Sequence, residues 1–196
     1  MEGIAHTLTN YLIRENVIAM ERSSIYKYGI LIGLEVCLNT LISIIIAVLC
    51  HMEWETLVFF AVFTLLRSYA GGLHLSSYSS CLICSCMSLL GLLLVVKHLN
   101  IDNSYSIGIV LFSLFIIKLL APVEDINRPI SPSELRIFRK MLNRSIIKII
   151  VLAIIFYLME LDRLLLMISV TTMFMVGILV LGKINYKKCI RKCNVN

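Results

Sequence analysis

Residues 28–50 read YGILIGLEVCLNTLISIIIAVLC, an apolar run whose strongly polar members are Glu35 and Asn39. A helix of about 20 apolar residues crosses the hydrocarbon core of a bilayer, so this run is long enough to span a membrane. Glu35 and Asn39 are four residues apart and share one helix face. A charged side chain at that depth costs about 2.5–3.5 kcal/mol on insertion scales unless it is paired, protonated or hydrated. The pair predicts either a hydrogen bond to another helix or subunit, or a place in the lining of a reaction cavity.

The composition extends this conclusion to the whole chain. Of the 196 residues, 59% are hydrophobic and 15% are charged, and the mean hydropathy is +0.92. A soluble domain has about 45–50% apolar and about 25% charged residues. One globular core cannot bury this excess, so lipid must solvate much of the surface. We therefore expect an all-α, polytopic integral membrane protein with a single domain over residues 1–196.

We predict about six apolar segments, of which four to six are true spans. Segment 54–66 is too short to cross without strain, so a re-entrant element is the alternative there. If the segments cross the membrane in alternating directions and the N-terminus lies inside, 15 of the 18 Lys and Arg residues fall on the inner side. Such an excess marks the cytoplasmic side, which would hold both termini and the loop after residue 66. The segments are 28–50, 54–66, 78–96, 105–121, 146–159 and 164–182.

The net charge of +6 is explained by this topology and by attraction to anionic lipid, and we expect no nucleic-acid partner. Residues 1–27 contain charges that interrupt the apolar core of a signal peptide. Their apolar residues recur at near-helical spacing, which predicts an amphipathic helix on the inner membrane surface. Seven cysteines, an odd number, mostly beside membrane segments, argue against a disulfide framework.

Residues 122–145 are expected to form a cytoplasmic loop and a basic helix. All three prolines lie at 122, 129 and 132, and proline both fixes φ and removes a backbone donor. This predicts a rigid extended loop. A short basic helix should follow from Ser133 to Arg144, along the membrane surface and separate from the span that comes next.

The chemistry is concentrated in residues 67–81, which begin RSYAGGLH and end at Cys81. A cysteine is nucleophilic as its thiolate, and His74 is the obvious base. In one continuous helix the two side chains would be about 10 Å apart, whereas proton transfer needs about 3 Å. The backbone must therefore fold back between them, and Gly71-Gly72 permits such a turn.

A helix that starts just before Cys81 would favour this chemistry. Ser77, Ser79 and Ser80 are candidate N-caps, and the first turn would then present the sulfur. Its unpaired N–H groups favour a thiolate and can hold the oxyanion of a tetrahedral intermediate.

Other interpretations of these cysteines stay open. A cysteine in an apolar segment is usually a small hydrophobic residue, and we assign Cys84 and Cys86 that role. A zinc site made by these two with His74 and Cys81 would lack a second C-x-x-C pair. We expect no metal and no organic cofactor.

Two motifs together resemble the accessory gene regulator protein B (AgrB) family of bacterial membrane cysteine endopeptidases, which act in quorum sensing. The first is Arg67-x-x-x-Gly71-Gly72-x-His74 with the cysteine seven residues beyond His74. The second is the loop APVEDINRPI at 121–130. The resemblance covers essentially the whole chain, including its length and the order of its apolar segments.

The resemblance implies that Cys81 is the nucleophile and His74 its partner. It also implies the substrate: a precursor signal peptide with an amphipathic N-terminus and an acidic C-terminal tail. Cys81 would release the tail and hold the remainder as a thioester, and an internal cysteine or serine would then close a thiolactone or lactone ring. The family further suggests a homodimer in the bacterial cell membrane.

The supporting residues have open roles. Arg67 either orients the acidic tail or supports the fold of the site, and the basic surface from 136 to 148 would suit tail capture. Glu124, Asp125 or Asn127 could orient His74, or simply end a rigid loop. We group these residues with candidates for substrate binding or support: Gly71, Gly72, Arg128, Arg136, Arg139 and Lys140.

A different class of function fits some of the same residues. A transporter or export helper for a small peptide would use Glu35, Asn39 and Lys118 to line a path through the membrane. Such a protein would carry its peptide without cleaving it.

Overall fold

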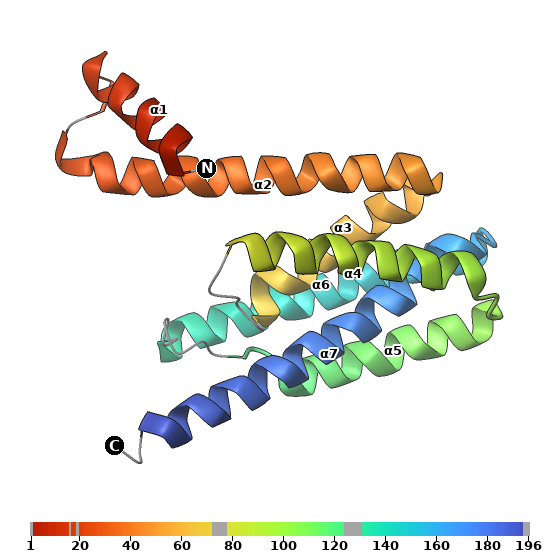
Figure 1. The fold of residues 1–196 in the computed structure, drawn as a ribbon. Helices are drawn as coiled ribbons and strands as arrows, with labels where there is room; N and C mark the ends of the chain where they lie inside the picture. Colours follow the sequence, from red (N-terminus) through yellow and green to blue (C-terminus); the bar gives the residue numbers. More distant parts are fainter. Residues whose placement is uncertain (1, 16, 19, 72–77, 124–130, 194–196) are drawn as a thin grey trace.

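The computed structural model describes residues 2–15, 17–18, 20–71, 78–123 and 131–193. This part of the chain is helical (Figure 1). Its elements are α1 (Glu2–Arg14), the 3-10 helix η1 (Met20–Arg22), α2 (Ser23–Cys50), α3 (Glu53–Ala70), α4 (Tyr78–His98), α5 (Asn103–Leu120), α6 (Pro132–Leu158) and α7 (Asp162–Cys193). The expected all-α membrane fold is confirmed.

Every predicted apolar segment lies almost wholly within one of the six long helices. Five of these, α2, α4, α5, α6 and α7, are long and apolar enough to cross a membrane, judged by length and composition over the described residues. The sixth, α3, carries Glu53 and Glu55 in its first turn and Arg67 in its last. Its 18 residues extend for about 27 Å. It runs obliquely from the end of the bundle where α2 stops to the end where α5 stops, so segment 54–66 crosses the bundle (Figure 1).

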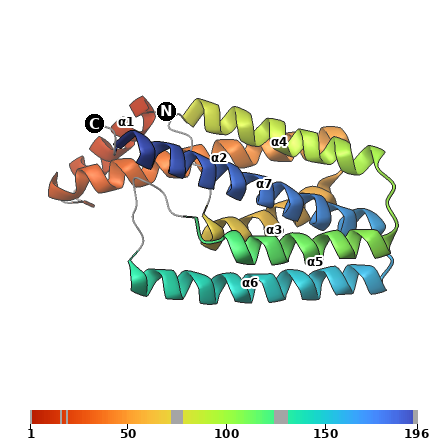
Figure 2. The same ribbon diagram turned by 90° about the horizontal axis from the view of Figure 1, so that it is seen from below.

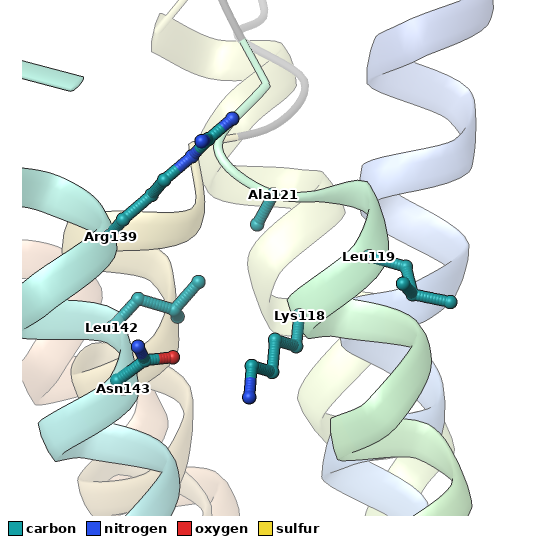
Figure 3. A pocket seen from close by; sticks show the side chains of 6 residues that line it. All are labelled: Lys118, Leu119, Ala121, Arg139, Leu142 and Asn143. Carbon is teal, nitrogen blue, oxygen red and sulfur yellow. The ribbon is translucent and has the colours of Figure 1, made fainter. Parts of the chain in front are cut away.

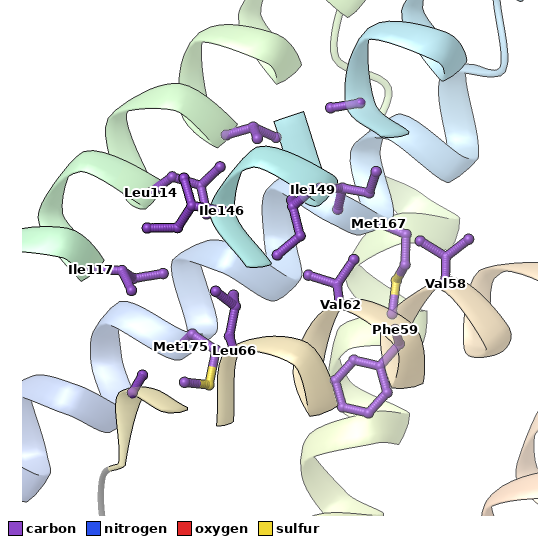
Figure 4. Packing of buried hydrophobic residues seen from close by; sticks show 14 of the residues in the cluster. Val58, Phe59, Val62, Leu66, Leu114, Ile117, Ile146, Ile149, Met167 and Met175 are labelled. Atoms are coloured by element: carbon purple, nitrogen blue, oxygen red, sulfur yellow. The ribbon is translucent and has the colours of Figure 1, made fainter. Parts of the chain in front are cut away.

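The core lies mainly among α3, α5, α6 and α7 (Figure 4), and α4 adds Leu89, Leu93 and Val96 to it. In α3 the apolar side chains of Val58, Phe59, Val62 and Leu66 are buried, because they recur with the helical period on one face. Helices α5 and α7 pack against each other, and Ser113 Oγ of α5 contacts Met173 Sδ of α7 at 3.8 Å. Small residues allow membrane helices to approach closely, where lipid offers no hydrophobic driving force. The buried hydroxyl residues of these two helices are Ser106, Ser113, Ser169, Thr171 and Thr172.

Helix α2 lies on the far side of the bundle from α5 and α6 (Figure 2). It packs against α1, α3 and α4 but buries only Ser43 and Ala47 within the chain. Helix α1 contacts α2 through a face that includes buried Ala5 and Thr9, whereas Ile4, Leu8 and Tyr11 are exposed. The predicted amphipathic N-terminal helix is therefore present, with apolar residues left for another surface. Its place on the inner membrane surface stays a prediction.

The expectation of a separate surface helix ending at Arg144 is wrong. Helix α6 is continuous from Pro132 to Leu158, so the basic segment and the following apolar segment form one rod. The physical reason is visible in the sequence, because no glycine or proline occurs between 133 and 158 to interrupt the hydrogen-bond ladder.

A capping box fixes the start of α6. The Glu134 backbone N donates to Ser131 Oγ at 3.3 Å, and the Ser131 backbone N donates to Glu134 Oε2 at 3.0 Å. Two donors that the helix leaves unpaired are satisfied in this way. The proline loop therefore ends at a defined residue.

We expect Ser131→Ala to destabilise the protein by about 1 kcal/mol, since an N-cap hydroxyl contributes that much. The corresponding fall in Tm is about 2–4 °C for a chain of this size, measurable by thermal unfolding in detergent. The matched control is Thr40→Ala, because the Thr40 hydroxyl donates to Val36 O of its own helix at 2.8 Å and caps nothing. Equal Tm values for the two variants would contradict the capping role.

Candidate active site

The end of α3 is joined to the start of the proline loop. Val123 N donates to Ala70 O at 2.9 Å, and Gly71 and Val123 form a parallel β-bridge. Gly71 has φ 74° and ψ −148°, a conformation that is essentially restricted to glycine. A Cβ at this position would also collide with the carbonyl oxygen of Val123. Only glycine fits this junction between two segments that are far apart in the chain.

Arg67 supports the same junction from within α3. Its Nη1 donates to Gly71 O at 2.6 Å, with the contact partly buried. The four-residue spacing places the guanidinium over the last turn of the helix, whose carbonyls lack partners within the helix. This contact supports the interpretation that Arg67 stabilises the fold of the site.

Cys81 is the fourth residue of α4, and its side chain is exposed. The predicted placement in the first turn of a helix is therefore correct. The first four N–H groups of a helix have no partner within it, and the helix dipole is positive there. The start of α4 lies at the same end of the bundle as the end of α3 (Figure 1).

Several predicted site residues lie outside the described part of the chain. They are Gly72, His74, Glu124, Asp125, Asn127 and Arg128. Gly72 directly follows Gly71, and Glu124 directly follows Val123. The β-bridge thus joins one residue of the first family motif to one residue of the second. The contact between His74 and Cys81 stays a prediction.

The basic candidates lie on α6, away from Cys81. Arg136 and Lys140 are exposed on the outer surface of α6. Arg139 lines a pocket between α5 and α6 (Figure 3). Helix α6 packs against α3, α5 and α7, whereas α4 packs against α2, α3 and α7. The structure therefore places these cations on the opposite side of α3 and α7 from Cys81 (Figure 2).

Asn39 of α2 contacts α4. Cys86 Sγ approaches Asn39 Oδ1 at 4.0 Å in a partly buried contact, and Glu35 is half-buried. Lys118 lines the pocket between α5 and α6, on the other side of the bundle from α2 (Figure 2). Lys118 is therefore not brought together with Glu35 and Asn39, as a transport path through these three residues would need.

Sequence reasoning missed two features. The first is the backbone contact of Val123 with the end of α3. A bridge between two single residues cannot be predicted from sequence, because it does not depend on their side chains. The second is the pocket that Lys118 and Asn143 line together with Arg139. Predicting this pocket would have required the alignment of α5 against α6.

These features define a class: a multi-pass helical membrane protein with an exposed thiol in the first turn of a helix, close in sequence to a glycine junction. Sequence comparison then identifies the family. Accessory gene regulator B (AgrB) matches over residues 5–188, and the chain belongs to this family.

Two relatives from Clostridium perfringens are themselves named for their likeness to AgrB. An AgrB-like protein of strain SM101 is 30% identical over 121 residues, which are 58% of this chain and 56% of that protein. AgrB-like protein 2 of strain 13 is 26% identical over 141 residues, which are 68% of this chain and 66% of that protein. The matched region thus spans less than two thirds of each relative. No solved structure matches the chain.

Proposed function

We propose that the protein is a membrane cysteine endopeptidase that removes the acidic C-terminal tail of a quorum-sensing precursor peptide. The observation that carries this proposal is the exposed thiol of Cys81 in the first turn of α4. That thiol follows the Gly71–Val123 junction by a short loop that includes His74. Both termini and this site face the cytoplasm, in keeping with the distribution of basic residues.

The reaction has two acyl transfers. His74 accepts the proton of the Cys81 thiol, and the sulfur attacks the scissile carbonyl carbon. The oxyanion is held by N–H groups at the start of α4. The C–N bond then breaks, the proton passes from His74 to the amine of the departing tail, and a thioester remains on Cys81.

An internal cysteine or serine of the peptide then attacks the thioester carbonyl. The new ring bond forms as the bond to Cys81 breaks, and the thiol of Cys81 regains a proton through His74. Exchange between two thioesters is nearly balanced in free energy, so the ring accumulates only if water is excluded. A site bounded by apolar helices limits water and holds the internal nucleophile near the carbonyl.

The remaining supporting residues are assigned by charge and position. The exposed basic row of α6, which comprises Arg136, Lys140, Arg144 and Lys148 at four-residue spacing, attracts the acidic tail during approach. Glu124, Asp125 and Asn127 complete the loop that begins at Val123, and one of them orients His74. The enzyme works as a homodimer.

The test is reconstitution of the full chain in liposomes with a candidate precursor peptide. We expect a transient increase in protein mass equal to the peptide without its tail, located at Cys81 by digestion and tandem mass spectrometry. Release of the free tail should accompany it. Tail release with no adduct at Cys81, even after acid quenching, would exclude this mechanism.

Arg67→Met tests the support of the site loop. Methionine keeps an apolar stem and loses the donor to Gly71 O. A hydrogen bond from a charged group contributes about 1.5–3 kcal/mol, so we expect cleavage to fall by roughly tenfold or more. Tail release in liposomes measures the effect. Arg163→Met, at the opposite end of the bundle, is the matched control and should cleave normally.

The same variant separates the two roles of Arg67. A residue that supports the loop affects all substrates, so the loss should be the same for a precursor whose tail carboxylates are replaced by amides. A loss confined to the acidic-tailed peptide would instead assign Arg67 to tail recognition.

A further inference from the structure

A cationic pocket lies where α5 ends beside the first turns of α6 (Figure 3). Its volume is about 220 Å³, and its lining consists of Lys118, Leu119, Ala121, Arg139, Leu142 and Asn143. Lys118 and Asn143 reach into the gap between the two helices, while Arg139 extends toward the residues after Ala121 (Figure 3). Among the described residues, no carboxylate lines this pocket and none forms an ion pair with either cation.

The pocket lies at the level where the spans end. Lys118 is two residues before Leu120, the last residue of α5, which is one of the candidate spans. Arg139 lies about 10 Å along the axis from the first residue of α6. Ala121 lines the pocket and is two residues from Val123, at the bundle end that carries the Gly71 junction. Lipid headgroups occupy this level of a membrane protein.

Exposed apolar side chains occur close in sequence to the lining residues, with Phe115 one turn before Leu119 on α5 and Ile137 two residues before Arg139 on α6. Leu119 is 67% exposed, Phe115 is 60% exposed and Ile137 is 56% exposed. A ligand in the pocket would therefore meet two cations and an amide at one end and exposed apolar surface beside them. An anionic phospholipid has this arrangement of charge and chain, and basic pockets between membrane helices bind such headgroups.

The pocket is small and opens to the surface. Its volume of about 220 Å³ is below the range of about 300–1,000 Å³ for pockets that enclose most of a small organic ligand. Its cationic part therefore suits a group of the size of a phosphate. Arg139 is exposed and lies beside the basic row of α6, one residue before Lys140. It differs from that row in lining the pocket together with Lys118 and Asn143.

We propose that this pocket binds the phosphate of an anionic phospholipid, with Lys118 and Arg139 as its cationic ligands and Asn143 as a hydrogen-bond donor. The acyl chains lie against Leu119 and Phe115. Because Ala121 forms one wall, the bound headgroup packs against the segment that leads to Val123 and thereby stabilises the junction with Gly71.

The test is native mass spectrometry of the full chain, released from detergent with equal amounts of phosphatidylglycerol and phosphatidylcholine. We expect the wild-type protein to retain phosphatidylglycerol preferentially. The double variant Lys118→Gln/Arg139→Gln should lose roughly tenfold or more of that preference, since each basic residue at the surface contributes to anionic-lipid binding.

Two further variants make the result specific. Lys183→Gln/Lys187→Gln on α7 removes the same charge elsewhere and should keep the preference. Asn143→Phe keeps every charge and fills the pocket from an exposed position, so it should lose phosphatidylglycerol and still fold, as judged by helical circular dichroism. Equal losses in both double variants, or full retention by Asn143→Phe, would overturn the site. Displacement of the lipid by a short acidic peptide but not by added phosphatidylglycerol would assign the pocket to peptide and also overturn it.

Discussion

We expect Cys81→Ala to lower the rate of tail release by roughly four orders of magnitude or more, because loss of a catalytic nucleophile leaves only the weak effects of binding and oxyanion contacts. The thiol is exposed in the first turn of α4, so its removal creates no core cavity. Proteoliposomes, a precursor peptide and quantitative mass spectrometry of the free tail measure the loss. Circular dichroism should show an unchanged helical content.

Cys84→Ala is the matched control. Cys84 is also exposed and lies on the same helix only three residues further on, yet it has no proposed catalytic role. This variant should cleave at the normal rate. Alkylation adds a second readout: His74→Ala should slow the reaction of Cys81 with iodoacetamide near neutral pH, and should leave Cys84 unaffected, because it removes the base that forms the thiolate.

The two rival functions predict other outcomes. A transporter or export helper would lose secretion of the peptide in Cys81→Ala while precursor cleavage continued. A non-catalytic scaffold would show no thiol whose alkylation depends on His74. Either result would exclude the proposed peptidase.

The second large effect is expected for Gly71→Ala. Alanine at φ 74° and ψ −148° costs about 1–3 kcal/mol in backbone strain. Its Cβ also overlaps the carbonyl oxygen of Val123, which is backbone and cannot rotate away. The bridge between Gly71 and Val123 must therefore open, and the loop that carries His74 shifts.

A displacement of about 1 Å in catalytic groups costs about 100-fold in rate, and we expect a loss of that order in tail release. Helical content and elution in detergent should be preserved, because the helices do not depend on the junction. Gly91→Ala in α4 is the matched control, since a Cβ at Gly91 meets nothing within 4 Å. Normal cleavage by Gly71→Ala would show that the bridge does not position the site.

The sequence predicted the membrane fold because lipid imposes a simple rule on every segment. Apolar runs of sufficient length form helices whose backbone groups are satisfied internally, and all six predicted runs lie in long helices. The error at α6 arose from treating the basic residues before Arg144 as a boundary. Charge alone does not end a helix when no glycine, proline or cap interrupts it.

The candidate site was predictable where it depends on local chemistry. The expected helix start just before Cys81 is confirmed, because α4 begins at Tyr78. Ser79 and Ser80 therefore lie inside the helix and are wrong as N-cap candidates, and Ser77 lies outside the described residues. The bond from Val123 N to Ala70 O was not predictable, since it joins distant segments through backbone atoms that carry no residue signature. The pocket formed by Lys118, Arg139 and Asn143 was missed for the related reason that it depends on how two helices align.

The contact between Gly71 and Val123 also has a consequence for biosynthesis. A nascent chain that ends before Val123 has no bridge partner for Gly71, so this junction cannot form. On the proposed function, peptide cleavage therefore begins only after α5 and Val123 have been synthesised. A ribosome-bound fragment that ends before Val123 would contain Cys81 and His74 but would not cleave the precursor.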